Sequence, residues 1–182
     1  MTITAHHRIA FWLLASVALL STLIPGGPVE NRDFSHIHPA VLGAFNIFLT
    51  TLDLGALVLA VFALQRPRRW VAAWAFVAAI GFFGVYAIDL AQIFPRSPTP
   101  MSFALALIEV LGMCAAVPLM FAARNAVEWV ETSEPMAVDR RSMPLAATAA
   151  LILIGLGVVW FATDAAMQER APQAANVSIL SN

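Results

Sequence analysis

Residues 39–65 read PAVLGAFNIFLTTLDLGALVLAVFALQ and contain a single charged residue, Asp53. A helix needs roughly 20 apolar residues to cross the hydrocarbon core of a bilayer, and this run is longer than that. Pro39 suits the first turn of a helix, where its missing N–H costs nothing. The sequence RPRR at residues 66–69 then ends the run with positive charge and a helix-breaking proline. This stretch therefore predicts a transmembrane helix.

Four further apolar runs flank this one, at residues 9–25, 70–94, 101–123 and 144–163. They are continuously apolar, whereas a strand of a membrane barrel would alternate polar and apolar residues over ~10 positions. The sequence therefore predicts an all-α integral membrane protein, a bundle of about five transmembrane helices within residues 1–163. Residues 164–182 contain few large apolar side chains, and we expect a disordered tail there. The first run could be a signal peptide, but its length and the lack of a cleavage site favour a retained span.

The composition supports a membrane location and limits the partners. Of 182 residues, 60% are hydrophobic and 12% are charged, about half the charged share of a soluble protein. The net charge of −1 and the absence of a basic stripe argue against a nucleic-acid partner. The chain has no Lys and much Ala, which is typical of a GC-rich bacterial genome. The expected partners are the lipid bilayer, a lipophilic small molecule and another membrane protein.

The arginines predict the orientation, because loops on the cytoplasmic side carry an excess of positive charge. With the N-terminus inside, seven of the ten arginines lie on the cytoplasmic side and three lie outside. The sequence therefore favours a plasma-membrane protein with a cytoplasmic N-terminus and an external C-terminus. The cytoplasmic set is Arg8, Arg66, Arg68, Arg69, Arg124, Arg140 and Arg141, and the external set is Arg32, Arg96 and Arg170.

Three carboxylates lie inside the apolar runs, namely Asp53, Asp89 and Glu109. A charged group near the middle of a span costs roughly 2.5–3.5 kcal/mol on insertion scales, so it normally faces a protein interior or a cavity. From the external ends of their helices, we place Asp53 about 21 Å, Glu109 about 12 Å and Asp89 about 8 Å deep. We expect Asp53 and Glu109 to be catalytic candidates, and Asp89 is more often structural at such a shallow depth.

Other polar residues share helix faces with these acids. Asn46 and Thr50 precede Asp53 on one stripe of the second run, and Tyr86 lies one turn before Asp89. The sequence therefore predicts a pocket between the second, third and fourth runs, with Asn46, Tyr86 and Asp89 as ligand-binding residues. Gly43 and Gly112 would allow close helix approach or leave room for a ligand. Arg96 would lie just above the acids and could pair with one of them.

The loop histidines are weak candidates for a metal site. His36 and His38, with Asp33, have donor atoms at metal-like spacing, but a solvated loop is the favoured interpretation. No cofactor is expected, because haem in a bundle usually needs histidines on the helices. The single cysteine, Cys114, cannot form an intrachain disulfide. The chain also lacks a phosphate-binding loop and a dinucleotide fingerprint.

Three functions remain open from the sequence. The first is an acid-lined pocket that binds or rearranges a lipophilic small molecule, with Asp53 or Glu109 as general acid in an enzyme. The second, nearly as well supported, is an accessory subunit of a larger membrane complex, whose loop at residues 124–143 contacts a partner. The third, a proton or ion pathway, is weaker, because the second, third and fourth runs offer no polar residue between Asp53 and the cytoplasmic face.

Overall fold

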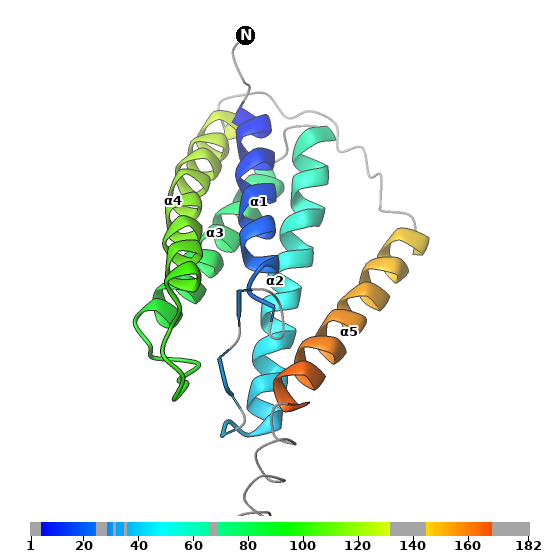
Figure 1. The fold of residues 1–182 in the computed structure, drawn as a ribbon. Helices are drawn as coiled ribbons and strands as arrows, with labels where there is room; N and C mark the ends of the chain where they lie inside the picture. The colour runs from blue at the N-terminus through cyan, green and yellow to red at the C-terminus, as the bar shows by residue number, and fades with distance from the viewer. Residues whose placement is uncertain are drawn as a thin grey trace, which may run out of the picture.

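The computed structural model describes residues 5–24, 29–30, 32–34, 36–65, 69–131 and 145–168. These residues form five α-helices and no strand, which confirms the all-α prediction (Figure 1). The boundaries differ from the sequence prediction mainly at the helix ends. Residues 164–168, expected in the tail, continue the last helix. The helices are α1 (Ala5–Ser21), α2 (Pro39–Gln65), α3 (Arg69–Leu90), α4 (Phe103–Glu131) and α5 (Leu145–Gln168).

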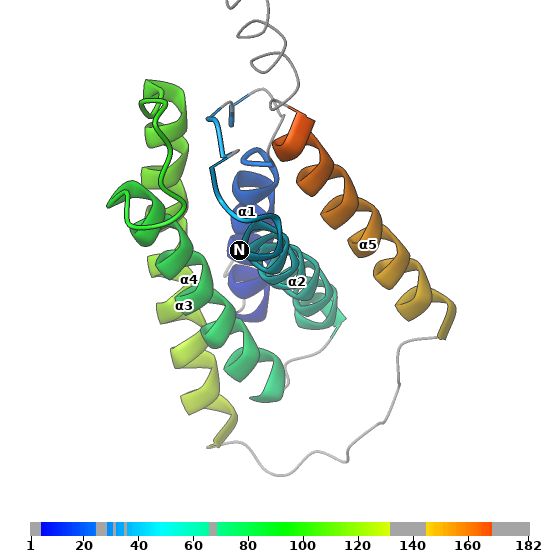
Figure 2. The same cartoon turned by 90° about the horizontal axis from the view of Figure 1, so that it is seen from below.

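Consecutive helices run in opposite directions, and α1 to α4 each pack against the next helix in the chain, whereas α5 lies away from α4 (Figure 1). The closest pair is α3 with α4, and α1 packs against both α2 and α4. Helix α5 packs chiefly against α2 and leans outward from the other helices, as the view along the bundle shows (Figure 2). The fold is therefore a four-helix group with a fifth helix attached to one side.

Small residues explain why α3 and α4 lie so close together. The buried faces of these helices are rich in alanine, including the fully buried Ala75, Ala79 and Ala116. Gly112 of α4 lies directly against the ring of Tyr86, so a Cβ atom at this position would collide with that ring. Small residues let helix backbones approach closely, which is how helices commonly associate within a membrane. Gly112 therefore has the close-approach role that its sequence context predicts, whereas Gly43 has open space around it.

The outward faces of the helices are apolar. Phe11 on α1, Trp74 on α3, Phe121 on α4 and Trp160 on α5 are all more than half exposed. Helices α2, α3 and α4 are long and apolar enough to cross a membrane. Helix α1 and the stretch Leu153–Ala162 of α5 are apolar but shorter. Three helices of the described chain are therefore consistent with a membrane protein.

Local hydrogen bonds fix the helix ends nearest the acidic residues. His38 Nδ1 accepts a hydrogen bond from the Ala40 N–H at the start of α2, and Ser102 Oγ accepts one from Leu105 at the start of α4. At the end of α3, the N–H of Ile93 bonds to the carbonyl of Ile88.

This α3 end is a Schellman motif. The N–H of Gln92 bonds to the carbonyl of Asp89, and Gln92 takes the left-handed conformation, with φ of 53°. The motif holds the last turn of α3, which carries Asp89, in a fixed geometry.

Candidate functional site

A buried arginine forms the centre of the polar cluster at one end of the bundle. Arg32 lies in the connection between α1 and α2, and its side chain is 4% exposed. Its Nη1 and Nη2 atoms donate to the two carboxylate oxygens of Asp89, each at 2.7 Å. Its Nε and Nη2 atoms donate to Glu30 Oε1 at 2.9 Å and Oε2 at 2.6 Å. One guanidinium thus binds two carboxylates through paired hydrogen bonds, the strongest geometry for this type of ion pair.

The surroundings keep Arg32 charged. Burial of the guanidinium opposes its charge, but the hydrogen bonds and negative charges of Glu30 and Asp89 outweigh this effect and raise the pKa of Arg32 above its ordinary value. The ring of Phe34 lies 5.3 Å from the guanidinium carbon and adds a cation–π contact. Arg32 therefore remains a cation throughout the accessible pH range.

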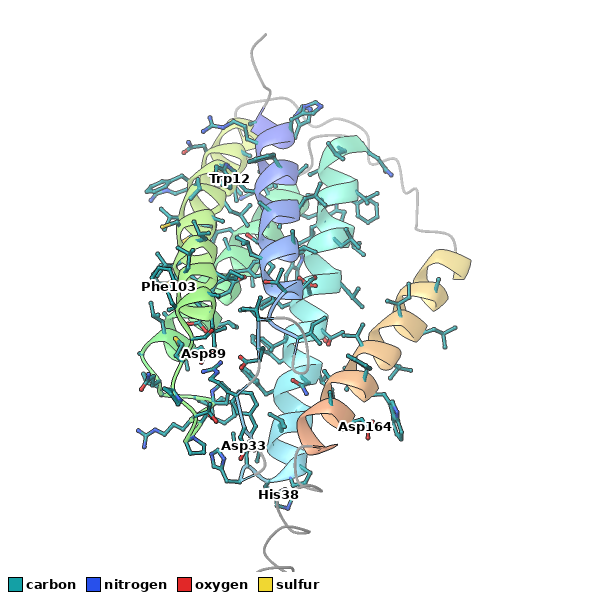
Figure 3. All side chains as sticks on the ribbon, viewed as in Figure 1. Trp12, Asp33, His38, Asp89, Phe103 and Asp164 are labelled. Atoms are coloured by element: carbon teal, nitrogen blue, oxygen red, sulfur yellow. The ribbon has the colours of Figure 1, made fainter. Side chains whose placement is uncertain are left out.

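Two loops meet around this arginine. Ser97 Oγ donates to the Asp33 carbonyl at 2.9 Å, which joins the α3–α4 connection to the segment that carries Arg32. Figure 3 shows Asp33 and Asp89 toward the same end of the bundle, with His38 beyond them. Beside this contact is a polar cavity of about 360 Å³, which Arg32, Gln92 and Arg96 help to line. The cluster is therefore next to a polar opening at this end.

The sequence predicted the wrong arginine as the partner of the buried acids. Arg96 was expected to pair with Asp89 or Glu109, but Asp89 is bound by Arg32 and the Arg96 side chain is exposed. Both arginines lie in connections at this end, and only the packing of the α1–α2 connection brings Arg32 inward. The sequence interpretation also missed Glu30 as a binding partner. An acid two residues before an arginine is a local signal that could have suggested this pair.

Glu109 lies in the interior beside this cluster. Its side chain is fully buried, and neither carboxylate oxygen accepts a hydrogen bond from the described residues. It is close enough to Asp89, Arg32 and Glu30 for their charges to act on it. A buried polar group without a partner is rare in a folded protein and calls for a specific explanation. Glu109 is therefore the most unusual carboxyl group in the described chain.

Tyr86 is near both candidate acids. The residue is fully buried, and its hydroxyl has no hydrogen-bond partner among the described residues. It is close enough to Asp53 and Glu109 to interact with the charge of both. The structure thus places Tyr86, Asp89 and Glu109 in one neighbourhood, and Asp53 is also close enough to act on the tyrosine.

Asp53 faces a different space. A cavity of about 270 Å³ lies between α1, α2 and α5, and its lining is mostly apolar. Ser21 donates a hydrogen bond to Asp53 Oδ2 at 2.9 Å, while Oδ1 is buried and has no partner among the described residues. The polar lining residues are Ser21, Asn46, Thr50 and Asp53, and the apolar ones include Leu20, Leu49, Leu57, Ile154 and Val158.

The position of this cavity corrects one sequence expectation. The stripe of Asn46, Thr50 and Asp53 does line a single cavity, but α1 and α5 enclose it and not α3 and α4. The reason is that α3 and α4 pack tightly on each other, so this stripe of α2 is left facing α1 and α5. Glu109 does not line this cavity. The two candidate acids therefore occupy separate environments.

The loop histidines take part in local structure. His38 caps α2 through Nδ1, as described above, and the backbone N–H of Asp33 donates to Thr99 Oγ1. Within the ranges that the structure describes, no three His, Cys, Asp or Glu side chains are grouped as metal ligands. The contacts of Asp33 and His38 therefore support the loop interpretation.

Comparison with known families identifies the chain. Residues 5–141 match the family described as "Domain of unknown function (DUF8051)", and the chain belongs to this family. The match contains Arg32, Asp53, Asp89 and Glu109 and ends before α5 begins. No curated protein and no solved structure shows significant similarity to the chain. The family description assigns no activity. The two candidate sites of the chain are the cavity at Asp53 and the cluster around Arg32.

Proposed function

We propose that this chain is a bacterial plasma-membrane protein that binds a lipophilic small molecule with a cationic or hydrogen-bond-donating end. The binding site is the cavity between α1, α2 and α5. All five helices lie in the bilayer, and the N-terminus is cytoplasmic. The apolar exterior of the bundle supports the membrane location, and the buried carboxyl group of Asp53 supports the ligand.

The apolar exterior supports insertion of all five helices. Large apolar side chains such as Phe11 and Trp160 are exposed on α1 and α5 as well as on the three longer helices. Exposed apolar surface of this extent is costly in water but costs nothing beside lipid. Arg8, Arg69 and Arg124 lie toward the same end of the antiparallel bundle, which matches a cytoplasmic face.

The observation that carries the ligand proposal is the unpartnered oxygen of Asp53 beside an apolar cavity. Asp53 Oδ1 is buried without a donor among the described residues, whereas Oδ2 accepts a hydrogen bond from Ser21. A carboxylate in such a place costs roughly 2.5–3.5 kcal/mol on insertion scales, and a cationic or donor group on a ligand would offset part of this cost. The leucine, isoleucine and valine side chains of the lining would bind the hydrocarbon part of the same ligand.

The same arrangement is suited to acid catalysis. A protonated Asp53 could donate its proton to a double bond or leaving group of a ligand held in the cavity. Asn46, which is buried and lines the cavity, could orient a polar group of that ligand. Glu109 lies outside the cavity lining, so Asp53 is the general acid in this version of the proposal.

The test is binding of matched probes to the purified full-length chain in detergent. Dodecylamine and dodecanol carry the same hydrocarbon, but only the amine supplies a cation. A hydrogen bond to a charged group contributes about 1.5–3 kcal/mol, so we expect the amine to bind about 10- to 100-fold more tightly than the alcohol. This preference should disappear in Asp53→Asn. Isothermal titration calorimetry and ligand-dependent thermal stabilisation would measure both affinities.

Asp164→Asn is the matched control. It makes the same chemical change on α5, but Asp164 is exposed and does not line the cavity (Figure 3). This variant should keep the amine preference. Equal affinities of the two probes for the unmodified chain would show that Asp53 does not bind the cationic end of a ligand. Binding of neither probe would refute the proposal that the cavity binds a lipophilic ligand, and it would favour the accessory-subunit hypothesis.

A further inference from the structure

A second site lies outside the Asp53 cavity, at the carboxyl groups of Asp89 and Glu109. The Glu109 side chain is fully buried, with both oxygens lacking a donor among the described residues. Its carboxyl group lies within hydrogen-bond reach of the Asp89 carboxyl group. Two ionised carboxylates are both acceptors and repel each other, so they can hydrogen-bond only when one of them carries a proton.

The hydrogen bonds of Arg32 decide where that proton resides. Both oxygens of Asp89 accept N–H groups of Arg32, so each already serves as a hydrogen-bond acceptor. Glu109 receives no such bond from any residue that the structure describes. The cluster contains three carboxyl groups, those of Glu30, Asp89 and Glu109, and one guanidinium. With all groups ionised, two negative charges would remain uncompensated in a buried place.

We propose that Asp89 and Glu109 form a proton-binding site, in which Glu109 holds the proton and donates it in a hydrogen bond to Asp89. Only an O–H bond forms or breaks when the proton enters or leaves. The site is separate from the cavity at Asp53, so the inference does not depend on the proposed ligand. The polar cavity lined by Arg32 and Gln92 opens beside the cluster, on the side of Arg32.

The titratable groups that act on Glu109 lie on α3 and in the α1–α2 connection. The groups that act on it are Asp89 and Tyr86 from α3, with Arg32 and Glu30 from the α1–α2 connection. Asp53 of α2 acts on Tyr86 and is not among the groups that act on Glu109. A metal ion is the less favoured occupant, because the described residues contain no group of three His, Cys, Asp or Glu ligands.

Infrared spectroscopy of the full-length chain in lipid vesicles tests this site directly. The C=O stretch of a protonated carboxyl group is separate from the bands of carboxylates and amides. We expect one such band to remain at neutral pH and to shift when the protein is made with ¹³C-labelled glutamate. Glu109→Gln should abolish the band, and Asp89→Asn should shift it because the hydrogen-bond acceptor changes. Asp53→Asn is the control and should leave the glutamate band unchanged.

The labelling result holds even if a variant fails to fold, because it is obtained on the unmodified chain. Absence of any glutamate carboxyl band at neutral pH would overturn the proposal. A band that persists in folded Glu109→Gln would do the same. Disappearance of the band on addition of Na⁺ at constant pH would show that a cation, and not a proton, occupies the site. Loss of amine binding with an intact glutamate band would refute only the Asp53 proposal.

Discussion

Removing the central arginine is the strongest perturbation that the structure offers. Arg32→Ala would leave the buried carboxylates of Glu30 and Asp89 without a counter-charge, beside a third buried acid. Four N–H donations at 2.6–2.9 Å would be lost. Breaking a buried ion pair by removing one partner costs about 3–5 kcal/mol, because the remaining charge stays buried and unpaired. We expect a loss of stability in that range.

Thermal unfolding of the full-length chain in detergent measures this effect. For a chain of this size, 1 kcal/mol changes Tm by roughly 2–4 °C, so Arg32→Ala should lower Tm by about 6–20 °C. Arg96→Ala is the matched control, because Arg96 is exposed on the neighbouring connection. A surface substitution usually changes stability by no more than about 0.5 kcal/mol, or about 2 °C here.

A second substitution separates charge from geometry. Arg32→Lys keeps the positive charge but cannot donate to two carboxylates through a planar fork, so its Tm should lie between those of the unmodified chain and Arg32→Ala. Equal Tm values for Arg32→Ala and Arg96→Ala would refute the reasoning. That result would mean that the Arg32 ion pairs contribute nothing to the stability of the bundle.

Two further predictions concern the backbone around the cluster. Gly112→Ala should destabilise the chain by about 1–3 kcal/mol, because the added Cβ collides with the Tyr86 ring, whereas Gly43→Ala, in open space, should stabilise it by about 0.5–1 kcal/mol. Equal thermal shifts for these two variants would contradict the close packing of α3 on α4. Gln92→Gly should stabilise the α3 end by about 0.5–1 kcal/mol, since Gln92 has φ of 53° and glycine adopts this conformation without strain. An unchanged or lowered Tm would show that this conformation is not a source of strain.

The helices could be predicted from the sequence because a long apolar run can satisfy its backbone only as a helix. The ends were less certain. The apolar run at residues 70–94 extends past the true end of α3 at Leu90, because Ile93 and Phe94 are apolar but follow the last helical residue. Helix α4 continues past its apolar run at residues 101–123, through Arg124 to Glu131.

The candidate acids could be found from the sequence, but their grouping could not. Asp53, Asp89 and Glu109 stand out because each interrupts an apolar run. Which helix faces which, however, depends on how the side chains of all the helices pack together. The sequence prediction placed the pocket against α3 and α4, yet the stripe of α2 that carries Asp53 faces α1 and α5.

The sequence by itself therefore determined the helical class, the order of the helices and the presence of costly carboxyl groups within them. These are local properties, set by hydrophobicity along the chain and by the price of a charge in an apolar surrounding. Only the tertiary structure decided that Arg32, and not Arg96, binds Asp89, and that Glu109 has no donor within the part of the chain that the structure describes. Both outcomes depend on contacts between residues far apart in the chain, and such contacts are fixed by packing once the helices have come together.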